Sequence, residues 1–242
     1  MSDGVDKTLS DAVRSCLDAG DPLGKIALVN QAALDLQSGK LRVGGEDELP
    51  EAIRAPGRPV LPQLVHPRDL PQRGLGSEEG RAALLHAVTH IEFNAINLAL
   101  DAVYRFRVMP AQYYLDWMSV AVDEARHFSL LAQRLKELGY AYGAFQAHNG
   151  LWEMAERTAD SCLARMALVP RVLEARGLDV TPGMIVRLRS LGDQRSADIL
   201  EVILAEEVRH VAIGSHWFAW CCEREGLSPE PTFIRLISGV AK

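Results

Sequence analysis

Two short motifs in this 242-residue chain pair a carboxylate with an imidazole at the same spacing. Both are Glu-x-x-His with arginine at the third position, namely Glu124-Ala125-Arg126-His127 and Glu207-Val208-Arg209-His210. Residues three apart on an α-helix lie about one turn apart on one face, so each motif projects both side chains in one direction. Because the surrounding positions on each face are apolar, both pairs are predicted to point into the core, where an unpaired carboxylate would be costly.

Two further glutamates have the spacing needed to complete the site. Glu92 and Glu124 are equally far in sequence from a turn expected near residue 108, so an antiparallel hairpin would bring them to the same height. Glu174 precedes Glu207 by nearly the same interval as Glu92 precedes Glu124, which indicates a repeated hairpin.

The third helix carries the ligand with the weakest support. Glu174 lies four residues after Pro170 and three before Gly177, so an interrupted helix would have to deliver it. Glu153 and Glu156 are the alternatives on that helix, and the sequence leaves the choice open.

Carboxylates and imidazoles in these numbers favour a centre of two metal ions. Four carboxylates and two neutral imidazoles would nearly balance two divalent cations, and oxygen and nitrogen ligands suit iron or manganese. The predicted metal ligands are Glu92, Glu124, His127, Glu174, Glu207 and His210.

Helical periodicity, punctuated by proline and glycine, predicts an all-α fold with four long antiparallel helices. They are expected at 77–106, 110–138, 150–176 and 193–225, with a kink at Pro170, an end at Gly177 and a separate short helix from Pro182 to about Gly192. The chain divides accordingly into N-terminal helices with a proline-rich wrapping arm (1–76), a four-helix bundle (77–226) and a C-terminal extension (227–242).

Composition narrows the class of protein. Hydrophobic residues make up 48% and charged residues 24%, as in ordinary globular domains, and the net charge of −6 argues against a general nucleic-acid binder. No apolar run is long enough for a membrane span and no secretory signal opens the chain, so we expect a cytoplasmic protein with its four cysteines reduced.

Other chemically capable side chains are expected to serve the fold. His86 and His90 share a helix face roughly opposite Glu92 and are expected to pack there rather than form a second metal pair. Four aromatic residues near the first turn are expected to fill the core rather than relay electrons: Tyr104, Tyr113, Tyr114 and Trp117.

Several longer strings resemble a known family. They are Gly80-Arg81-Ala82-Ala83-Leu84-Leu85-His86, His90-Ile91-Glu92, Glu124-Ala125-Arg126-His127-Phe128, Glu174-Ala175-Arg176-Gly177-Leu178-Asp179-Val180-Thr181-Pro182 and Glu207-Val208-Arg209-His210-Val211-Ala212-Ile213-Gly214. Through them the chain resembles the ferritin-like superfamily, closely the bacterial family catalogued as domain of unknown function 455, and distantly the di-iron tRNA hydroxylases. The resemblance implies a ferritin-like antiparallel bundle, these metal ligands, and iron in preference to manganese. It implies no substrate.

Three functions are compatible with these features. The first is an oxidoreductase that uses O₂ or peroxide on an unknown small-molecule or macromolecular substrate. An electron-donor protein would supply its electrons. The second is a ferroxidase or another metal- or oxidant-handling protein, and the third is a non-catalytic ferritin-like binding protein. A homodimer is expected as an oligomeric form, no membrane partner is expected, and a nucleic-acid partner enters only as tRNA, by the distant similarity.

Overall fold

The computed structural model describes residues 7–43 and 50–240, and within these ranges the chain is helical with no β-strand. The all-α prediction is therefore confirmed for the described residues. The elements are α1 (Leu9–Asp18), α2 (Pro22–Gln37), η1 (Pro67–Asp69), α3 (Glu78–Arg105), α4 (Ala111–Glu137), α5 (Gly150–Arg157), α6 (Cys162–Leu168), η2 (Val169–Glu174), α7 (Ala175–Ser190), α8 (Gln194–Arg224) and α9 (Pro229–Val240).

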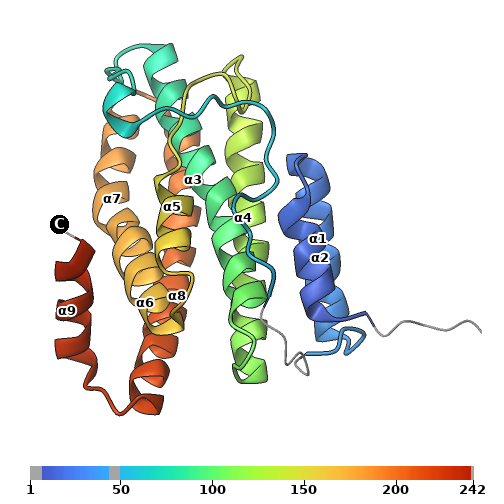
Figure 1. Ribbon diagram of the computed structural model, residues 1–242. Coiled ribbons are helices and arrows are strands. Elements are labelled where there is room, and N and C mark those ends of the chain that lie inside the picture. The colour runs from blue at the N-terminus through green and yellow to red at the C-terminus, as the bar shows by residue number, and fades with distance from the viewer. Residues whose placement is uncertain (1–6, 44–49, 241–242) are drawn as a thin grey trace, which may run out of the picture.

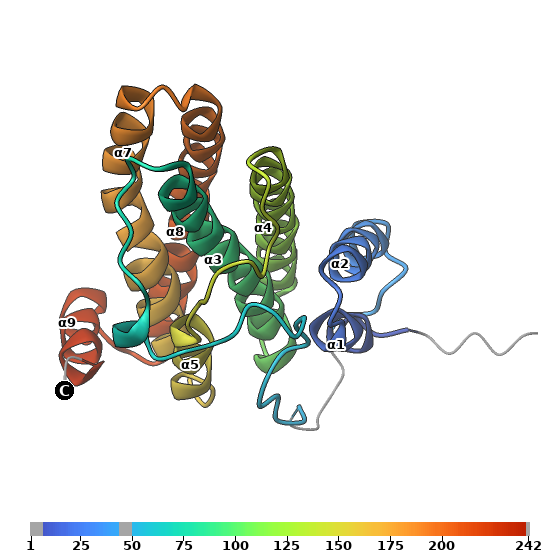
Figure 2. The same ribbon diagram turned by 90° about the horizontal axis from the view of Figure 1, so that it is seen from above.

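Two helical hairpins form the centre of the molecule (Figure 1). Helices α3 and α4 make one hairpin; α8 packs against α7, η2 and α6 to make the other, and α4 also contacts α8. Helices α1 and α2 lie on the outside of α3 and α4, whereas α9 lies at the opposite side against α6 and α8 (Figure 2). None of the described helices is both long and apolar enough to cross a membrane.

The ends of the long helices follow from local chemistry. The Ser77 hydroxyl accepts a hydrogen bond from the Gly80 amide at 3.0 Å and starts α3, and the Asp193 carboxylate starts α8 in the same way. Gly139 and Gly192 adopt φ values of 80° and 79° just after α4 and α7, a conformation that favours glycine. The predicted limits of the first, second and fourth long helices are confirmed to within two residues.

The third predicted helix, 150–176, is wrong as a single element. It is divided into α5 and α6, and the Arg165 side chain of α6 reaches back to the end of α5. Arg165 donates to the Ala155 carbonyl at 2.6 Å, to the Thr158 hydroxyl at 2.6 Å and to the Asp101 carboxylate at 2.6 Å. A fully buried guanidinium thus takes up the polar groups that an interrupted helix leaves unpaired.

Beyond α6 the chain departs from the prediction again. Pro170 has no amide hydrogen, and the helix widens there into the π-helical segment η2. Gly177 does not end the helix, and no separate helix begins at Pro182, because α7 runs through both. Buried Ile185 and Leu188 pack toward α8, and this tertiary contact outweighs the poor helix propensities of Gly177 and Pro182.

The described part of the proline-rich arm, residues 50–76, runs over the helices as expected for a wrapping segment. The Gly57 amide donates to the Leu17 carbonyl at 2.6 Å, and the Val65 amide donates to the Ala147 carbonyl at 2.9 Å. The Trp152 indole donates to a carbonyl of the arm at 3.0 Å. The division at residues 76 and 226 into separate domains stays a prediction.

Two apolar clusters fill the interior and leave a polar layer between them. One extends toward the α3–α4 turn and includes Trp117 and Trp217; the other lies toward the α7–α8 turn and includes Leu131 and Leu200. The layer between them contains the buried side chains of Glu92, Glu124, His127 and His210.

Candidate metal centre

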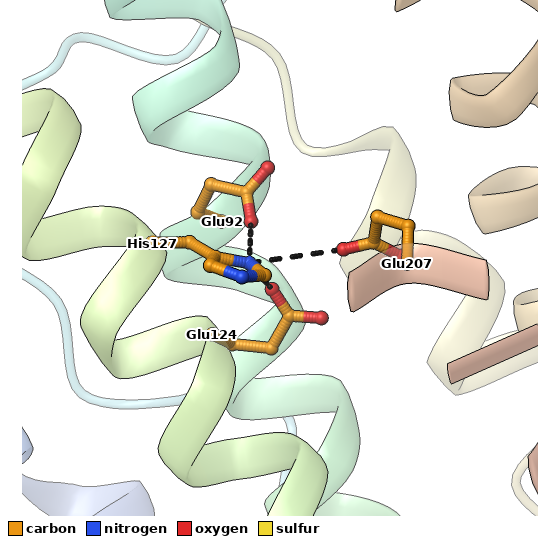
Figure 3. A group of neighbouring side chains, drawn as sticks. All are labelled: Glu92, Glu124, His127 and Glu207. Carbon is orange, nitrogen blue, oxygen red and sulfur yellow. Dashed lines mark hydrogen bonds and ion pairs between the residues drawn. The ribbon is translucent and has the colours of Figure 1, made fainter. Parts of the chain in front are cut away.

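Three helices bring four of the predicted ligands together (Figure 3). Glu92 comes from α3, Glu124 and His127 from α4 and Glu207 from α8, and one ligand atom of each lies within 4.8 Å of all the others. The Nδ1 atom of His127 is 3.1 Å from Glu92 Oε2, 3.2 Å from Glu124 Oε2 and 3.8 Å from Glu207 Oε1.

The second motif faces the same carboxylates. The Nδ1 atom of His210 lies 3.0 Å from Glu124 Oε1 and 3.4 Å from Glu207 Oε1. Glu124 therefore presents one oxygen to each imidazole, since its Oε2 is the atom beside His127. Glu207 also lies within 4 Å of both imidazoles, so these two glutamates are the carboxylates that the two motifs share.

Glu174 approaches the cluster from the end of η2. Its Oε2 atom is covered and has no hydrogen-bond partner. Burial, and then the charges of Glu207 and Glu124, raise the pKa of Glu174 well above its usual value. Glu174 is not one of the four residues within 4.8 Å of one another, so its role as a ligand stays a prediction. The alternatives Glu153 and Glu156 are exposed on α5.

Several ligand atoms in this layer are buried without a hydrogen bond. Among the described residues, Glu174 Oε2 and Glu207 Oε2 have no partner, and Glu124 Oε1 and His210 Nδ1 face each other at 3.0 Å without the geometry of a hydrogen bond. Buried polar atoms are almost always satisfied in folded proteins, so a cluster of unsatisfied oxygen and nitrogen acceptors fits a bound cation. This buried group of carboxylates and imidazoles could therefore hold a metal ion.

The outer nitrogens of both imidazoles are held by acids that the sequence analysis missed. His127 Nε2 lies 2.7 Å from Glu206 Oε2, and His210 Nε2 lies 3.1 Å from Asp123 Oδ2. Asp123 precedes Glu124 on α4 but contacts His210 on α8. Conversely, Glu206 precedes Glu207 on α8 but contacts His127 on α4. Such carboxylates fix the tautomer and direction of metal-binding histidines. The signal in the sequence was an acidic pair opening each motif, Asp123-Glu124 and Glu206-Glu207.

The two motif arginines complete this reciprocal arrangement. Arg126 on α4 pairs with Glu206, and the Arg209 guanidinium on α8 lies 2.5 Å from Asp123. Both arginines are about half exposed, so they lie outside the ligands and neutralise the outer acids.

In the absence of a metal ion, protons on the two imidazoles balance part of the carboxylate charge. Burial alone would lower the pKa of His127, but Glu124 and Glu92 raise it to about 11; Asp123 and Glu124 similarly overcome burial and raise the pKa of His210 to about 12. Burial would raise the pKa of Glu124, but its contacts with the two imidazoles outweigh burial and lower it, whereas burial and the charge of Glu124 raise the pKa of Glu92. A metal ion bound through Nδ1 of either imidazole would therefore have to displace a proton from it.

His86 and His90 lie outside this centre and pack as expected. His86 Nε2 accepts from the Gly143 amide at 2.9 Å, and His90 Nδ1 is 2.9 Å from the Tyr142 hydroxyl. Burial lowers the pKa of each histidine to about 4, so both are neutral near pH 7. They hold the segment after α4 against α3.

Comparison with known proteins gives the family. A family model described as "Protein of unknown function (DUF455)" matches residues 18–242. The chain belongs to the DUF455 family. An uncharacterized protein of Haemophilus influenzae is 43% identical to this DUF455 chain over 235 residues, which are 93% of this chain and 81% of that protein. No solved structure matches significantly.

Proposed function

We propose that this protein is a carboxylate-bridged di-metal oxidoreductase, most simply a di-iron enzyme, that uses O₂ or peroxide. The observation that carries the proposal is the convergence of two Glu-x-x-His motifs on shared, partly unsatisfied carboxylates. In this proposal α3, α4, the run α6–η2–α7 and α8 form a ferritin-like four-helix bundle.

The donor set supports two metal ions rather than one. Glu92 and His127 would bind one ion and Glu174 and His210 the other, with Glu124 and Glu207 shared between them. The four carboxylates carry four negative charges and the two imidazoles are neutral. Two divalent ions would balance these charges, whereas a single divalent ion would not. Oxygen and nitrogen ligands admit iron or manganese, and the resemblance to O₂-using ferritin-like proteins favours iron. Two ferrous ions would supply the electrons with which O₂ or peroxide is reduced.

The chain's own residues would orient the metal ligands and keep water away from the centre. Asp123 and Glu206 hold the two imidazoles with Nδ1 facing inward. The apolar clusters on either side of the polar layer keep bulk water away and strengthen every charge interaction within it. The organic substrate and an electron-donor protein stay predictions, as does a homodimer.

A ferroxidase role is the second candidate, and one observation favours it. Asp123 and Glu206 are only partly buried and also touch the inner imidazoles, so they form a carboxylate connection between solvent and the centre. A cation could follow such a connection more readily than an apolar substrate.

The test begins with untagged protein purified without added metal and loaded anaerobically with Fe(II). We expect about two iron ions per chain by elemental analysis and rapid O₂ uptake by the ferrous protein. O₂ uptake that stops when the bound iron is oxidised and resumes with a chemical reductant supports the oxidoreductase. Uptake that continues only with added Fe(II) supports the ferroxidase. A protein that takes up neither iron nor manganese contradicts both and leaves the non-catalytic alternative.

A further inference from the structure

Four aromatic rings form a row where the end of α8 packs against the start of α4. Trp220 and Trp217 come from α8, and Tyr113 and Trp117 come from α4. The ring centroids lie 5.8 Å apart between Trp220 and Trp217, 5.1 Å between Trp217 and Tyr113, and 6.3 Å between Tyr113 and Trp117. Trp220 is partly exposed, whereas the other three rings are buried. The row therefore leads from the protein surface into the core.

Two of these rings lie on the helix faces that carry predicted metal ligands. Trp217 follows His210 on α8 by seven residues, and Trp117 precedes Glu124 on α4 by seven residues. Seven residues are close to two full helical turns, or about 10 Å along the axis, so ring and ligand share a face. Both indoles belong to the apolar cluster that borders the polar layer.

The hydrogen bonds of the three buried rings differ in one respect that matters for redox chemistry. The Trp217 indole N–H donates to the Asp116 carboxylate at 2.9 Å. The Tyr113 hydroxyl donates to the Ala102 carbonyl at 3.3 Å, and among the described residues the Trp117 N–H has no partner. A carboxylate can take up a proton, whereas a backbone carbonyl cannot. An indole or phenol that loses an electron becomes strongly acidic, so of these three rings only Trp217 can release its proton together with an electron.

Fixed charges also favour Trp217 over its neighbour at the surface. The Arg224 guanidinium lies 5.2 Å from the centre of the Trp220 ring, and a cation there opposes positive charge on that ring. The Asp116 carboxylate has the opposite effect on Trp217. A positive charge that arrives at Trp220 is therefore expected to move inward to Trp217. Asp116 is itself partly exposed, so a proton that it accepts can exchange with solvent.

We propose that Trp217 carries single electrons between the protein surface and the metal centre, with Asp116 as its proton acceptor; this role rests on the proposed function. Trp217 gives one electron to the metal centre that peroxide has oxidised, and its N–H bond breaks as the proton moves to Asp116. A neutral indolyl radical and a carboxylic acid remain. A one-electron donor at the surface then returns an electron through Trp220, and Asp116 returns the proton. In sum, one electron passes from the donor to the centre, and the protein is restored.

The first test uses metal-free, chelator-treated full-length protein. A laser flash generates the one-electron oxidant tris(bipyridine)ruthenium(III) in solution, and transient absorption distinguishes a neutral tryptophan radical from its cation. In wild-type protein we expect the neutral radical to form promptly, because Asp116 takes the proton of Trp217. Trp220→Phe should lose most of the radical yield, because the oxidant reaches Trp217 through Trp220.

Asp116→Asn is the decisive variant. Its amide oxygen still accepts the indole N–H but cannot take up the proton, so the radical cation should persist and lose its proton only slowly to water. Because Asp116 is partly exposed, the fold should be retained, which circular dichroism checks. Trp152→Phe is the control and should change neither yield nor spectrum, since the buried Trp152 indole donates to the Arg54 carbonyl, away from the row.

Three results would contradict the proposal. They are the absence of any tryptophan radical in wild-type protein, a neutral radical that forms as promptly in Asp116→Asn as in wild type, and a full radical yield in Trp220→Phe. A loss of yield in Trp152→Phe equal to that in Trp220→Phe would contradict it as well.

A second measurement separates this proposal from the proposed function. Iron-loaded protein is oxidised with peroxide and then reduced anaerobically with the one-electron reductant hexaammineruthenium(II). Reduction of the iron should be slower in Asp116→Asn and Trp217→Phe than in wild type, at the same iron content. If these variants bind iron and are reduced as fast as wild type, the electron-carrying role is wrong although the proposed function stands. If the protein binds no metal, the proposed function fails and this role fails with it, while the metal-free radical still decides whether Trp217 and Asp116 act as a pair.

Discussion

Pro170 in η2 packs directly against Gly214 in α8, in a space that no larger residue could share. A Cβ atom at position 214 would collide with Cβ and Cγ of the proline ring. The contact sets how closely the π-helical segment approaches α8, and Glu174 lies one turn farther along that segment. A glycine on one helix thus positions a predicted ligand on another.

Gly214→Ala should therefore weaken both folding and metal binding. Pushing η2 away from α8 is expected to lower the free energy of unfolding by about 1–3 kcal/mol, as overpacking does, and to lose the metal that Glu174 would bind. Urea denaturation and elemental analysis measure the two effects. Gly183→Ala in exposed helix α7, where a Cβ meets nothing within 4 Å, is the matched control and should be neutral or stabilising by about 0.5–1 kcal/mol. Equal effects of the two substitutions would contradict this reading of the contact.

Glu124→Gln and Glu207→Gln should both remove metal but differ in their effect on the metal-free protein. Glu124 is the counter-ion of two protonated imidazoles, so its loss should cost about 1–3 kcal/mol of unfolding free energy. Burial and Glu124 raise the pKa of Glu207, so a neutral amide there should be tolerated or stabilising. Chemical denaturation at pH 7 in chelator measures the difference. His86→Gln should leave the metal content unchanged. If His86→Gln lost metal and Glu124→Gln retained it, the metal centre would not lie on the helix faces proposed here.

Asp123→Asn and Glu206→Gln should each weaken metal binding without removing a direct ligand. Each loses the carboxylate that orients one imidazole, and such losses commonly reduce metal affinity about 10–100-fold. Competition with a chelator of known affinity measures the change. Glu201→Gln is the control, because Glu201 is also an acid of α8 paired with an arginine, but at an exposed site distant from the imidazoles. An unchanged metal affinity in both test variants would show that Asp123 and Glu206 do not orient the imidazoles for metal binding.

Acid should destabilise the metal-free protein through His86 and His90. Burial lowers the pKa of each to about 4, below the unfolded value of about 6.5, so the unfolded chain binds more protons between these pH values. The contribution of these two histidines to stability is therefore full above pH 6.5 and falls as the pH drops toward 4, by at most about 1.4 kcal/mol per pH unit for each histidine. His127 and His210 add little in this window because both are already protonated in the folded state. Denaturation curves at pH 7 and pH 5 should show a smaller pH dependence for His86→Gln than for wild type; an identical dependence would refute the assignment.

The sequence by itself determined the features that depend on neighbours along the chain. The i, i+3 spacing of Glu124 and His127, and of Glu207 and His210, fixes a shared helix face wherever a helix forms. Ser77 and Asp193 mark helix starts for the same local reason, since a cap needs only the amides that follow it. The equal spacing of Glu92 and Glu124 about their turn also suffices to place them at one height in a hairpin.

Only the tertiary structure decided which contacts cross between helices. The rotation of α4 against α8 turns Nδ1 of each imidazole inward and gives Nε2 to Asp123 or Glu206, and no local rule specifies that rotation. Packing of Ile185 and Leu188 carries α7 through Gly177 and Pro182 against their intrinsic preference, and burial of Arg165 accounts for the break before α6. In each case the deciding energy comes from side chains distant in sequence, which become neighbours only when the core is packed.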